Sequence, residues 1–302
     1  MGEQKPGVPP PRARATRLID RGDVLRKELD RERAAGRTVG LVPTMGALHP
    51  GHAALIARAA AECDVTAVTI FVNPLQFAAG EDLSRYPRNL DADLELATAA
   101  GAALVFAPPV EEMFPGGRSA TVVHVAGLSD GLEGASRPSH FDGVATVVAR
   151  LFNLAGPARA YFGEKDFQQL AVVRRMASDL GIPVTVVGCR TVRDHDGVAW
   201  SSRNGYLSAD ERAAAPVLVR ALEAGAEAVA GPGRERAAGE VRRLMARIVA
   251  AEPLALLDYA ELVDAETLTP LDVIAPGAEI RLLLAAWVGG TRLIDNVGVT
   301  AP

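Results

Sequence analysis

The chain has 302 residues, of which 49% are hydrophobic and 23% charged, and its net charge is −5 at pH 7. This length allows one or two domains with a large core, and the composition is typical of a soluble globular protein. The acidic balance argues against nucleic acid as the main partner, and no apolar run approaches the roughly 20 residues that a membrane span needs.

The first sixteen residues are rich in Pro and Arg and lack the apolar segment of a secretory signal. We expect residues 1–16 to be a disordered leader. Cys63 and Cys189 are isolated, without the spacing of a metal site or a disulfide framework. Such thiols fit a cytoplasmic protein.

Strand and helix patterns alternate between the leader and about residue 190. Such alternation indicates βαβ units and a mostly parallel, Rossmann-like sheet covered on both faces, and we assign it to residues 17–190. Ligands of such sheets bind beyond the carboxyl ends of the strands. The patterns predict strands at 38–44, 65–72, 102–106, 121–125, 158–162 and 182–187, and helices at about 51–62, 89–100, 142–155 and 167–180.

The pattern changes after residue 190. Two Ala-, Arg- and Glu-rich stretches predict helices, and three later runs with short turns predict successive strands. We expect residues 191–302 to form a smaller lid domain with an antiparallel sheet backed by helices. The helices are predicted at 209–230 and 233–251, and the strands at 257–263, 279–285 and 291–294.

His49 and His52 stand in a turn between the first buried strand and the following helix. The free N–H groups and the dipole at a helix start attract anions, so this turn suits a phosphate group. The same sequence is also compatible with an ordinary Gly/Pro turn that carries two surface histidines without a function. The His-x-Gly-His pattern resembles the signature of the nucleotidyl-transferase superfamily.

Four other segments carry polar side chains after strands or near the domain junction, and one of them is the Gly-bearing loop 127–142. Asn73 and Gln76 follow the strand at 65–72, and Gln169 follows the turn Gly163–Asp166. Amides suit a hydroxylated substrate, although each could also cap a turn. Lys165 in that turn is one of only three lysines among 32 basic residues, which indicates a compact point charge. The polar segment 200–203 suits a loop that closes on polyphosphate.

Five motifs in this order resemble the pantoate–β-alanine ligase family. They are Pro-Thr-Met-Gly-Ala-Leu-His-x-Gly-His, Phe-Val-Asn-Pro-x-Gln-Phe, Tyr-Pro-Arg, Phe-Gly-Glu-Lys-Asp-Phe-Gln-Gln and Ser-Ser-Arg-Asn-Gly-Tyr-Leu, between about Val39 and Ser208. The resemblance implies ATP-dependent condensation of (R)-pantoate with β-alanine through pantoyl adenylate, with release of pyrophosphate and AMP. The product, pantothenate, is a precursor of coenzyme A.

The resemblance also implies roles for individual residues. His52, His49 and Lys165 would be catalytic, with His52 the proton donor. ATP would be bound by Met45, Gly46, His49, His52, Gly163, Glu164, Lys165, Asp166, Val192, Trp200, Ser201, Ser202 and Arg203, and pantoate or β-alanine by Asn73, Gln76 and Gln169. Trp200 departs from the family, which usually has Met or Leu there.

ATP is thus expected as a substrate and Mg²⁺ as an ion carried on its phosphates, with no protein ligands assigned. A homodimer is implied by the family. We expect Asp91 and Asp93 to be surface helix carboxylates, with indirect support of the Mg²⁺ site as the alternative. We expect His124 to be structural and assign no role to His195.

Two other functions are compatible with parts of the pattern. Another adenylyl transferase, for example one that makes a dinucleotide, would share His-x-Gly-His but would not need the two glutamine segments. A non-catalytic nucleotide-binding module would not need His49, His52 and Lys165 intact.

Overall fold

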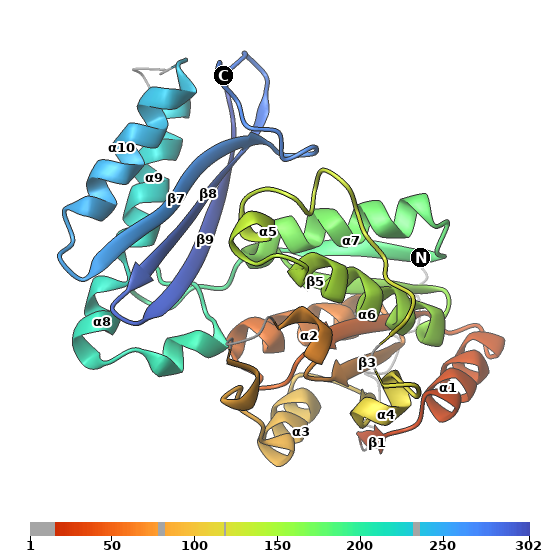
Figure 1. Cartoon of the computed structure of the whole chain (residues 1–302). Helices are drawn as coiled ribbons and strands as arrows, with labels where there is room; N and C mark the ends of the chain where they lie inside the picture. Colours follow the sequence, from red (N-terminus) through yellow and green to blue (C-terminus); the bar gives the residue numbers. More distant parts are fainter. Residues whose placement is uncertain (1–15, 78–81, 118, 232–235) are drawn as a thin grey trace, which may run out of the picture.

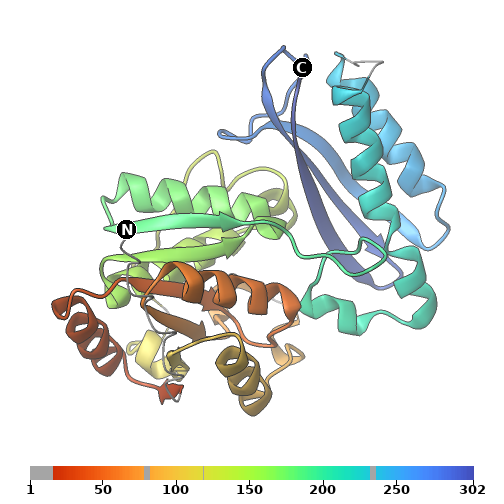
Figure 2. The same ribbon diagram turned by 180° about the vertical axis from the view of Figure 1, so that it is seen from behind.

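The computed structural model describes residues 16–77, 82–117, 119–231 and 236–302, so the predicted leader lies almost wholly outside the described residues. The described chain forms a larger parallel α/β domain and a smaller domain with an antiparallel sheet (Figures 1 and 2). The predicted fold class is therefore confirmed. None of the described helices has both the length and the apolar character needed to cross a membrane.

The larger sheet has six parallel strands in the order β1-β4-β3-β2-β5-β6. The chain adds β3 and β4 on one side of β2 and later β5 and β6 on the other. The order therefore reverses between β2 and β5, and the crevice beyond their carboxyl ends is where such sheets bind ligands. The strands are β1 (Arg17–Ile19), β2 (Val39–Thr44), β3 (Val65–Ile70), β4 (Leu104–Phe106), β5 (Ala158–Gly163) and β6 (Val184–Cys189).

Helices cover both faces of this sheet, because successive strand residues point to opposite faces. Leu41 packs in the cluster formed with α1, α6 and α7, whereas its neighbour Val42 packs in the cluster formed with α2 and α3. The helices are α1 (Gly22–Ala34), α2 (Pro50–Glu62), α3 (Leu90–Ala99), α4 (Val110–Met113), α5 (Glu133–Ser136), α6 (His140–Ala155) and α7 (Phe167–Asp179), with short 3-10 turns η1 (Pro74–Gln76), η2 (Asp82–Ser84) and η3 (Glu164–Asp166).

One predicted strand is wrong. Residues 121–125 run as irregular chain beside α6 and pair with no strand. The backbone N–H of Val123 donates to Oγ1 of Thr146, and the ring of His124 is hydrogen-bonded to Asp142 at 2.8 Å. These side chains of α6 replace the partners that a sheet would supply, and His124 is structural in the described chain.

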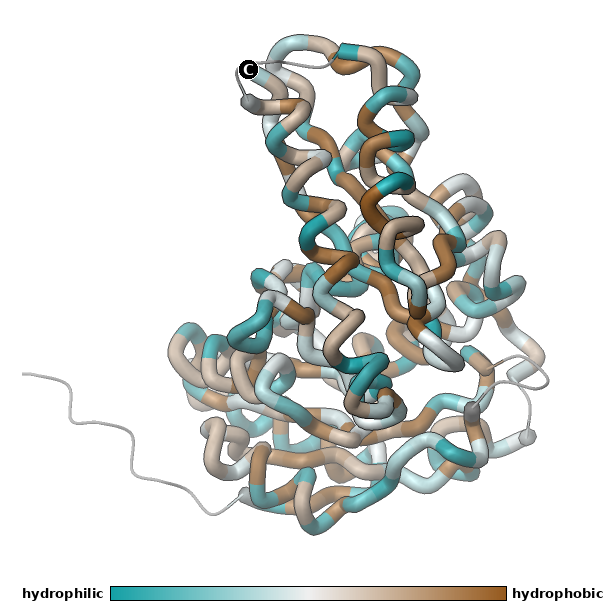
Figure 3. Tube along the Cα trace, turned by 90° about the vertical axis from the view of Figure 1, so that its left-hand side faces the viewer, coloured by the Kyte–Doolittle hydropathy of each residue, from teal (hydrophilic) through white to brown (hydrophobic). Residues whose placement is uncertain are grey.

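The smaller domain contains a three-stranded antiparallel sheet with α9 (Val217–Ala230) and α10 (Ala238–Ala250) on one face (Figure 1). Polar and apolar residues alternate along both helices, as expected for helices with one buried side (Figure 3). The predicted helix at 209–230 is interrupted at Pro216, because proline has no N–H for the preceding turn. The remaining elements are η4 (Ser202–Tyr206), α8 (Ala209–Ala214), β7 (Ala255–Asp264), β8 (Glu279–Val288) and β9 (Thr291–Thr300).

Gly143 on α6 allows η1 to pack directly against the helix. A Cβ atom at this position would lie 2.3 Å from the carbonyl oxygen of Leu75, a backbone atom that cannot move without shifting η1. The carbonyl of Gly143 also accepts a hydrogen bond from Nδ2 of Asn73 at 3.0 Å. This close approach fixes the loop that follows β3 at the edge of the sheet.

We expect Gly143→Ala to destabilise the protein by about 1–3 kcal/mol, because the added methyl group overpacks α6 against η1. Denaturant unfolding at equilibrium measures the change. Gly239→Ala on α10 is the matched control, since its methyl group would meet only the far end of Arg243 at 3.8 Å. That control should stay within about 0.5 kcal/mol of wild type. Equal stability of the two variants would contradict the packing argument.

Candidate active site

His49 and His52 cap the first turn of α2 reciprocally. Nδ1 of His49, the N-cap residue, accepts from the backbone N–H of Gly51 at 3.2 Å, and Nδ1 of His52 accepts from the N–H of His49 at 3.4 Å. This is the geometry of a capping box, with imidazoles in the usual places of Ser/Thr and Glu. Because each Nδ1 accepts, the partners assign the proton of each neutral ring to Nε2. Each histidine thus keeps one N–H donor for a ligand.

Both histidines are neutral at neutral pH. Burial, together with the positive charge of Lys165, lowers the pKa of His49 to about 4. Burial also lowers the pKa of His52 to about 3, with the neighbouring His49 acting in the same direction. The ring centroids are 4.1 Å apart, so two charged rings would repel each other strongly.

Asp93 on α3 holds the loop that leads to these histidines. Its carboxylate accepts from the backbone N–H groups of Ala47 at 3.0 Å and Leu48 at 2.7 Å. Gly46 and Ala47 both have positive φ, and a Cβ on Gly46 would lie 2.9 Å from Oδ2 of Asp93. Asp93 is only 4% exposed, so its prediction as a surface carboxylate was wrong, whereas Asp91 is exposed. The turn needs a buried acceptor because its N–H groups have no strand or helix partner.

The loop after β3 carries two side-chain amides with different roles: Asn73 stabilises the loop, and Gln76 faces the cavity. Asn73 is buried and donates through Nδ2 to Oε1 of Gln76 at 3.1 Å, while its Oδ1 accepts from the N–H of Leu75. The side-chain oxygen Oε1 of Gln76 is thus already hydrogen-bonded. Its Nε2 group remains available to donate to a ligand in the cavity that Gln76 lines. Asn73 lines the same cavity, but its polar atoms hold the loop.

The turn η3 after β5 carries Lys165 and Asp166. Nζ of Lys165 lies 3.5 Å from Oδ1 of Asp166, and the lysine side chain is 18% exposed. Burial raises the pKa of the Asp166 carboxyl, but the positive charges of Lys165 and Arg203 outweigh it and lower the pKa overall. Gln169 lies one helical turn further on, in α7.

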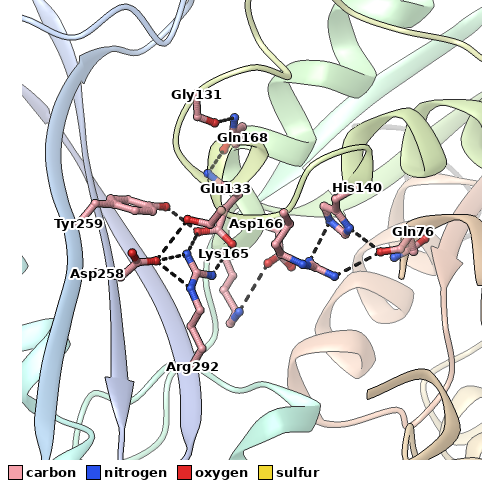
Figure 4. A network of polar contacts seen from close by, with 12 residues as sticks. Gln76, Gly131, Glu133, His140, Lys165, Asp166, Gln168, Asp258, Tyr259 and Arg292 are labelled. Carbon is pink, nitrogen blue, oxygen red and sulfur yellow. Dashed lines mark hydrogen bonds and ion pairs between the residues drawn. The ribbon is translucent and has the colours of Figure 1, made fainter. Parts of the chain in front are cut away.

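Arg137 and His140 belong to the site, although the sequence patterns assigned them no role. Nδ1 of His140 donates to the backbone oxygen of Gln76 at 2.8 Å (Figure 4). Nη2 of Arg137 donates to the same oxygen at 3.3 Å. Arg137 also contacts Nε2 of His140 at 3.1 Å. The loop 127–142 that contains them is polar and Gly-bearing, but nothing in its residue spacing predicts these contacts.

Two adjoining cavities bring these segments together. An inner cavity of about 220 Å³ lies at the carboxyl ends of the strands, and an interdomain cavity of about 870 Å³ shares part of its lining. Gly46 and Glu164 line neither cavity. The other predicted residues line the inner one: Met45, His49, His52, Asn73, Gln76, Gly163, Lys165, Asp166, Gln169, Val192, Trp200, Ser201, Ser202 and Arg203. Both cavities are lined by Arg137, His140, Lys165, Asp166, Gln169 and Arg203.

The segment that contains Trp200 closes over the histidine turn. The N–H of Trp200 donates to the oxygen of Val192 at 3.0 Å, and Oγ of Ser201 accepts from the N–H of Arg203. A Cβ on Gly51 would lie 3.8 Å from Cβ of Trp200, which places this tryptophan directly above the start of α2.

An ion-pair network joins the domains at the interdomain cavity. Arg292 of β9 donates to Glu133 of α5 at 2.6 and 2.7 Å and to Asp258 of β7 at 2.7 and 2.9 Å (Figure 4). Burial raises the pKa of Tyr259, so its protonated hydroxyl donates to Glu133. Oε1 of Gln168 accepts from the N–H of Glu133, and its Nε2 donates to the carbonyl oxygens of Leu128 and Gly131, so this side chain holds the loop.

Among the described residues, one group of acidic and imidazole ligand atoms is close enough for a metal ion: Asp194, His195 and Asp196. Arg212 already donates to both carboxylates, at 2.7 Å to Asp194 and 3.0 Å to Asp196. None of the three lines either cavity. A guanidinium therefore occupies the place of a cation, and the group is structural.

The neutral histidines predict a pH dependence of stability. Below pH 6.5 the unfolded chain takes up protons that His49 and His52 in the folded chain do not. The free energy of unfolding should therefore fall with decreasing pH down to about pH 4, by up to about 1.4 kcal/mol per pH unit for each histidine. His52→Gln keeps an acceptor for the His49 N–H and should make this slope shallower in denaturant unfolding.

The control for that measurement is His195→Gln. The hydrogen bond and charge of Asp194 raise the pKa of His195, which is exposed, so this variant should keep the wild-type slope between pH 6 and pH 4. An unchanged slope in His52→Gln would show that His52 is protonated in the folded protein.

Comparison with known proteins agrees with this geometry. Residues 17–298 match the family model described as pantoate–β-alanine ligase. The chain is 51% identical to pantothenate synthetase of Moorella thermoacetica over 265 residues, covering 88% of this chain and 92% of the relative. The crystal structure of pantothenate synthetase from Thermus thermophilus superposes with a TM-score of 0.86 at 51% identity, covering 93% of this chain and 98% of that one.

A third similar structure carries ligands. Pantoate–β-alanine ligase from Francisella tularensis, solved in complex with "Beta-gamma ATP" and β-alanine, is similar with a TM-score of 0.76 and 30% identity, covering 94% of this chain and 97% of that one. Motifs, sheet order and whole-chain similarity lead to the same conclusion. The chain belongs to the pantoate–β-alanine ligase family.

Proposed function

We propose that this chain condenses pantoate with β-alanine at the expense of ATP, through a pantoyl adenylate bound at the carboxyl ends of β2, β3 and β5. One observation carries the proposal: a reciprocal pair of neutral imidazoles, a lysine and two amides converge on one cavity. The cations and N–H donors suit a polyphosphate, and the amides suit a small hydroxy acid. Membership of the family supports the same substrates.

In the first step, a carboxylate oxygen of pantoate attacks the α-phosphorus of ATP, and the bond from that phosphorus to the bridging oxygen breaks to release pyrophosphate. Pantoate is already an anion, so the step needs no general base. It needs two anions to be held in line and the charge on the leaving group to be stabilised. Lys165 and Arg203 supply positive charge, and Nε2–H of His49 and His52 supply hydrogen bonds to phosphate oxygens. His52 would act as a proton donor only in its protonated form, which the negative charge of a bound triphosphate would favour.

In the second step, the amino nitrogen of β-alanine attacks the acyl carbon, the bond from that carbon to the phosphate oxygen breaks, and AMP leaves as the amine loses its proton. Gln76 and Gln169 would hold the pantoyl group through both steps. Nε2 of Gln76 is a neutral donor, because Asn73 engages its oxygen. Gln169 lines both cavities and lies where the two ligands would meet.

Mg²⁺ would travel with the triphosphate and neutralise part of its charge. Asp166 is the carboxylate that lines both cavities, and a single carboxylate suits an ion held mainly by phosphates and water. We also propose the cytoplasm as the location, since the free thiols Cys63 and Cys189 stay reduced there, and a homodimer as the family implies.

The direct test is AMP formation from ATP and pantoate that depends on β-alanine. Pyrophosphate release from ATP and pantoate without AMP formation on addition of β-alanine would limit the activity to adenylation. Nucleotide transfer in the absence of pantoate would favour an enzyme that makes a dinucleotide. The lack of pyrophosphate release under every condition would leave a nucleotide-binding module.

Lys165→Ala should slow pantoyl adenylate formation by about 10²–10³, because one electrostatic donor to the developing charge is lost. Single-turnover pyrophosphate release measures the rate. Lys27→Ala is the matched control, since Lys27 lies on α1 with a 77% exposed side chain paired to Asp23. A rate for Lys165→Ala within tenfold of the control would reject the role.

Gln169→Ala should raise the KM for pantoate far more than the KM for ATP, because a neutral amide contacts the hydroxy acid and not the polyphosphate. Gln169→Glu keeps the length of the side chain and adds a negative charge, so it should weaken pantoate binding further. Steady-state titration of each substrate separates the two constants. An equal increase in both would indicate a general structural defect.

A further inference from the structure

We infer that Asn296, on β9 of the smaller domain, is a positioning residue. It fixes the backbone of the turn η3 and thereby places Lys165 for the formation of pantoyl adenylate. The inference rests on the proposed function, because it assigns Asn296 an effect through Lys165. Asn296 donates hydrogen bonds to the backbone of the turn, so it would act on Lys165 and not on the phosphates directly.

The contacts are made by a single buried amide. Nδ2 of Asn296 donates to the carbonyl oxygen of Glu164 at 3.0 Å and to that of Lys165 at 2.7 Å. Asn296 is 3% exposed, so water does not compete with these bonds. Both protons of one amide group thus bind successive carbonyls of the turn and fix two peptide planes at once.

The orientation of the amide is determined by its other partner. Oδ1 of Asn296 accepts from Nε of Arg281 at 2.7 Å. A flipped amide would set its NH₂ group against a guanidinium, which has no acceptor, and its oxygen against two carbonyl oxygens. The assignment of nitrogen and oxygen is therefore the one arrangement that satisfies all three contacts.

Arg281 is itself immobilised. Its guanidinium lies 4.0 Å from the centroid of the Phe167 ring, at the start of α7, and contacts the Glu164 carboxylate at 3.4 Å. Burial lowers the pKa of Arg281, and the charge of Glu164 opposes that shift. Glu164 therefore pairs with Arg281 across the domain junction, and it lines neither cavity.

A second ion pair anchors the backbone of Asn296. Its N–H donates to Oδ1 of Asp295 at 2.8 Å, and the same carboxylate is paired with Arg193 at 2.6 and 3.0 Å. Asn296 is thus held at both its backbone and its side chain. The position of Lys165 depends on β9 as well as on β5, and displacement of the smaller domain would move the lysine.

Asn296→Asp tests the inference, because it keeps the shape and the acceptor for Arg281 but removes both donors to the turn. We expect pantoyl adenylate formation to slow by about 10- to 100-fold, the cost of misplacing a reacting group by about 1 Å. The reaction of β-alanine with a preformed pantoyl adenylate, in which no pyrophosphate leaves, should stay within about threefold of wild type. Asn296→Ala should slow adenylate formation to a similar extent, and it replaces Asn296→Asp in the test if the aspartate variant does not fold.

Two further measurements make the test specific. Asn153→Asp is the matched control, because Asn153 also donates to a backbone carbonyl but lies on the exposed part of α6. In a Lys165→Ala background, Asn296→Asp should cause almost no additional loss, since the two residues act in series. A wild-type adenylation rate in Asn296→Asp, equal slowing of both half-reactions, or additive losses in the double variant would each overturn the inference. If Lys165→Ala itself has no effect, the proposed role of Lys165 fails first.

Discussion

The reciprocal cap between His49 and His52 is the interaction on which the site depends. The first N–H groups of a helix need acceptors, and here two imidazoles supply them through Nδ1. That bond fixes each ring and its tautomer before any ligand arrives. Burial keeps the rings neutral, so the histidines can donate hydrogen bonds without repelling the lysine nearby. The three-residue spacing of the motif is thus the spacing of a helix cap.

The remaining charges are divided between the site and the domain junction. Lys165, Arg137 and Arg203 line both cavities. Three other arginines of the described chain form ion pairs across or beside the junction: Arg193 with Asp295, Arg281 with Glu164 and Arg292 with Glu133. These pairs are partly shielded from water, so breaking one by removing its carboxylate would leave a costly buried charge. They fix the position of the smaller domain relative to the turn that carries Lys165.

Local patterns predicted the features that depend on neighbours in the chain. The apolar runs predicted five of the six parallel strands, and the strand–turn–helix around His49 predicted the helix start. Long-range contacts were not predictable in this way. Asp93 lies 46 residues from the N–H of Ala47 that it binds, Arg137 lies 61 from Gln76, and Asn296 lies 131 from Lys165. The wrong strand at 121–125 has the same origin, because its partners are side chains of α6.

Two amides in this molecule are oriented by the same physical rule. Nδ2 of Asn73 donates to Oε1 of Gln76, and Nε of Arg281 donates to Oδ1 of Asn296. The NH₂ groups of Gln76 and Asn296 therefore each point in one direction. A partner that can only donate at that contact makes the opposite orientation unfavourable. Neutral donors arranged in this way add hydrogen bonds without adding charge to a confined cavity. Positive charge is then concentrated on the lysine turn, where the leaving phosphates would need it most.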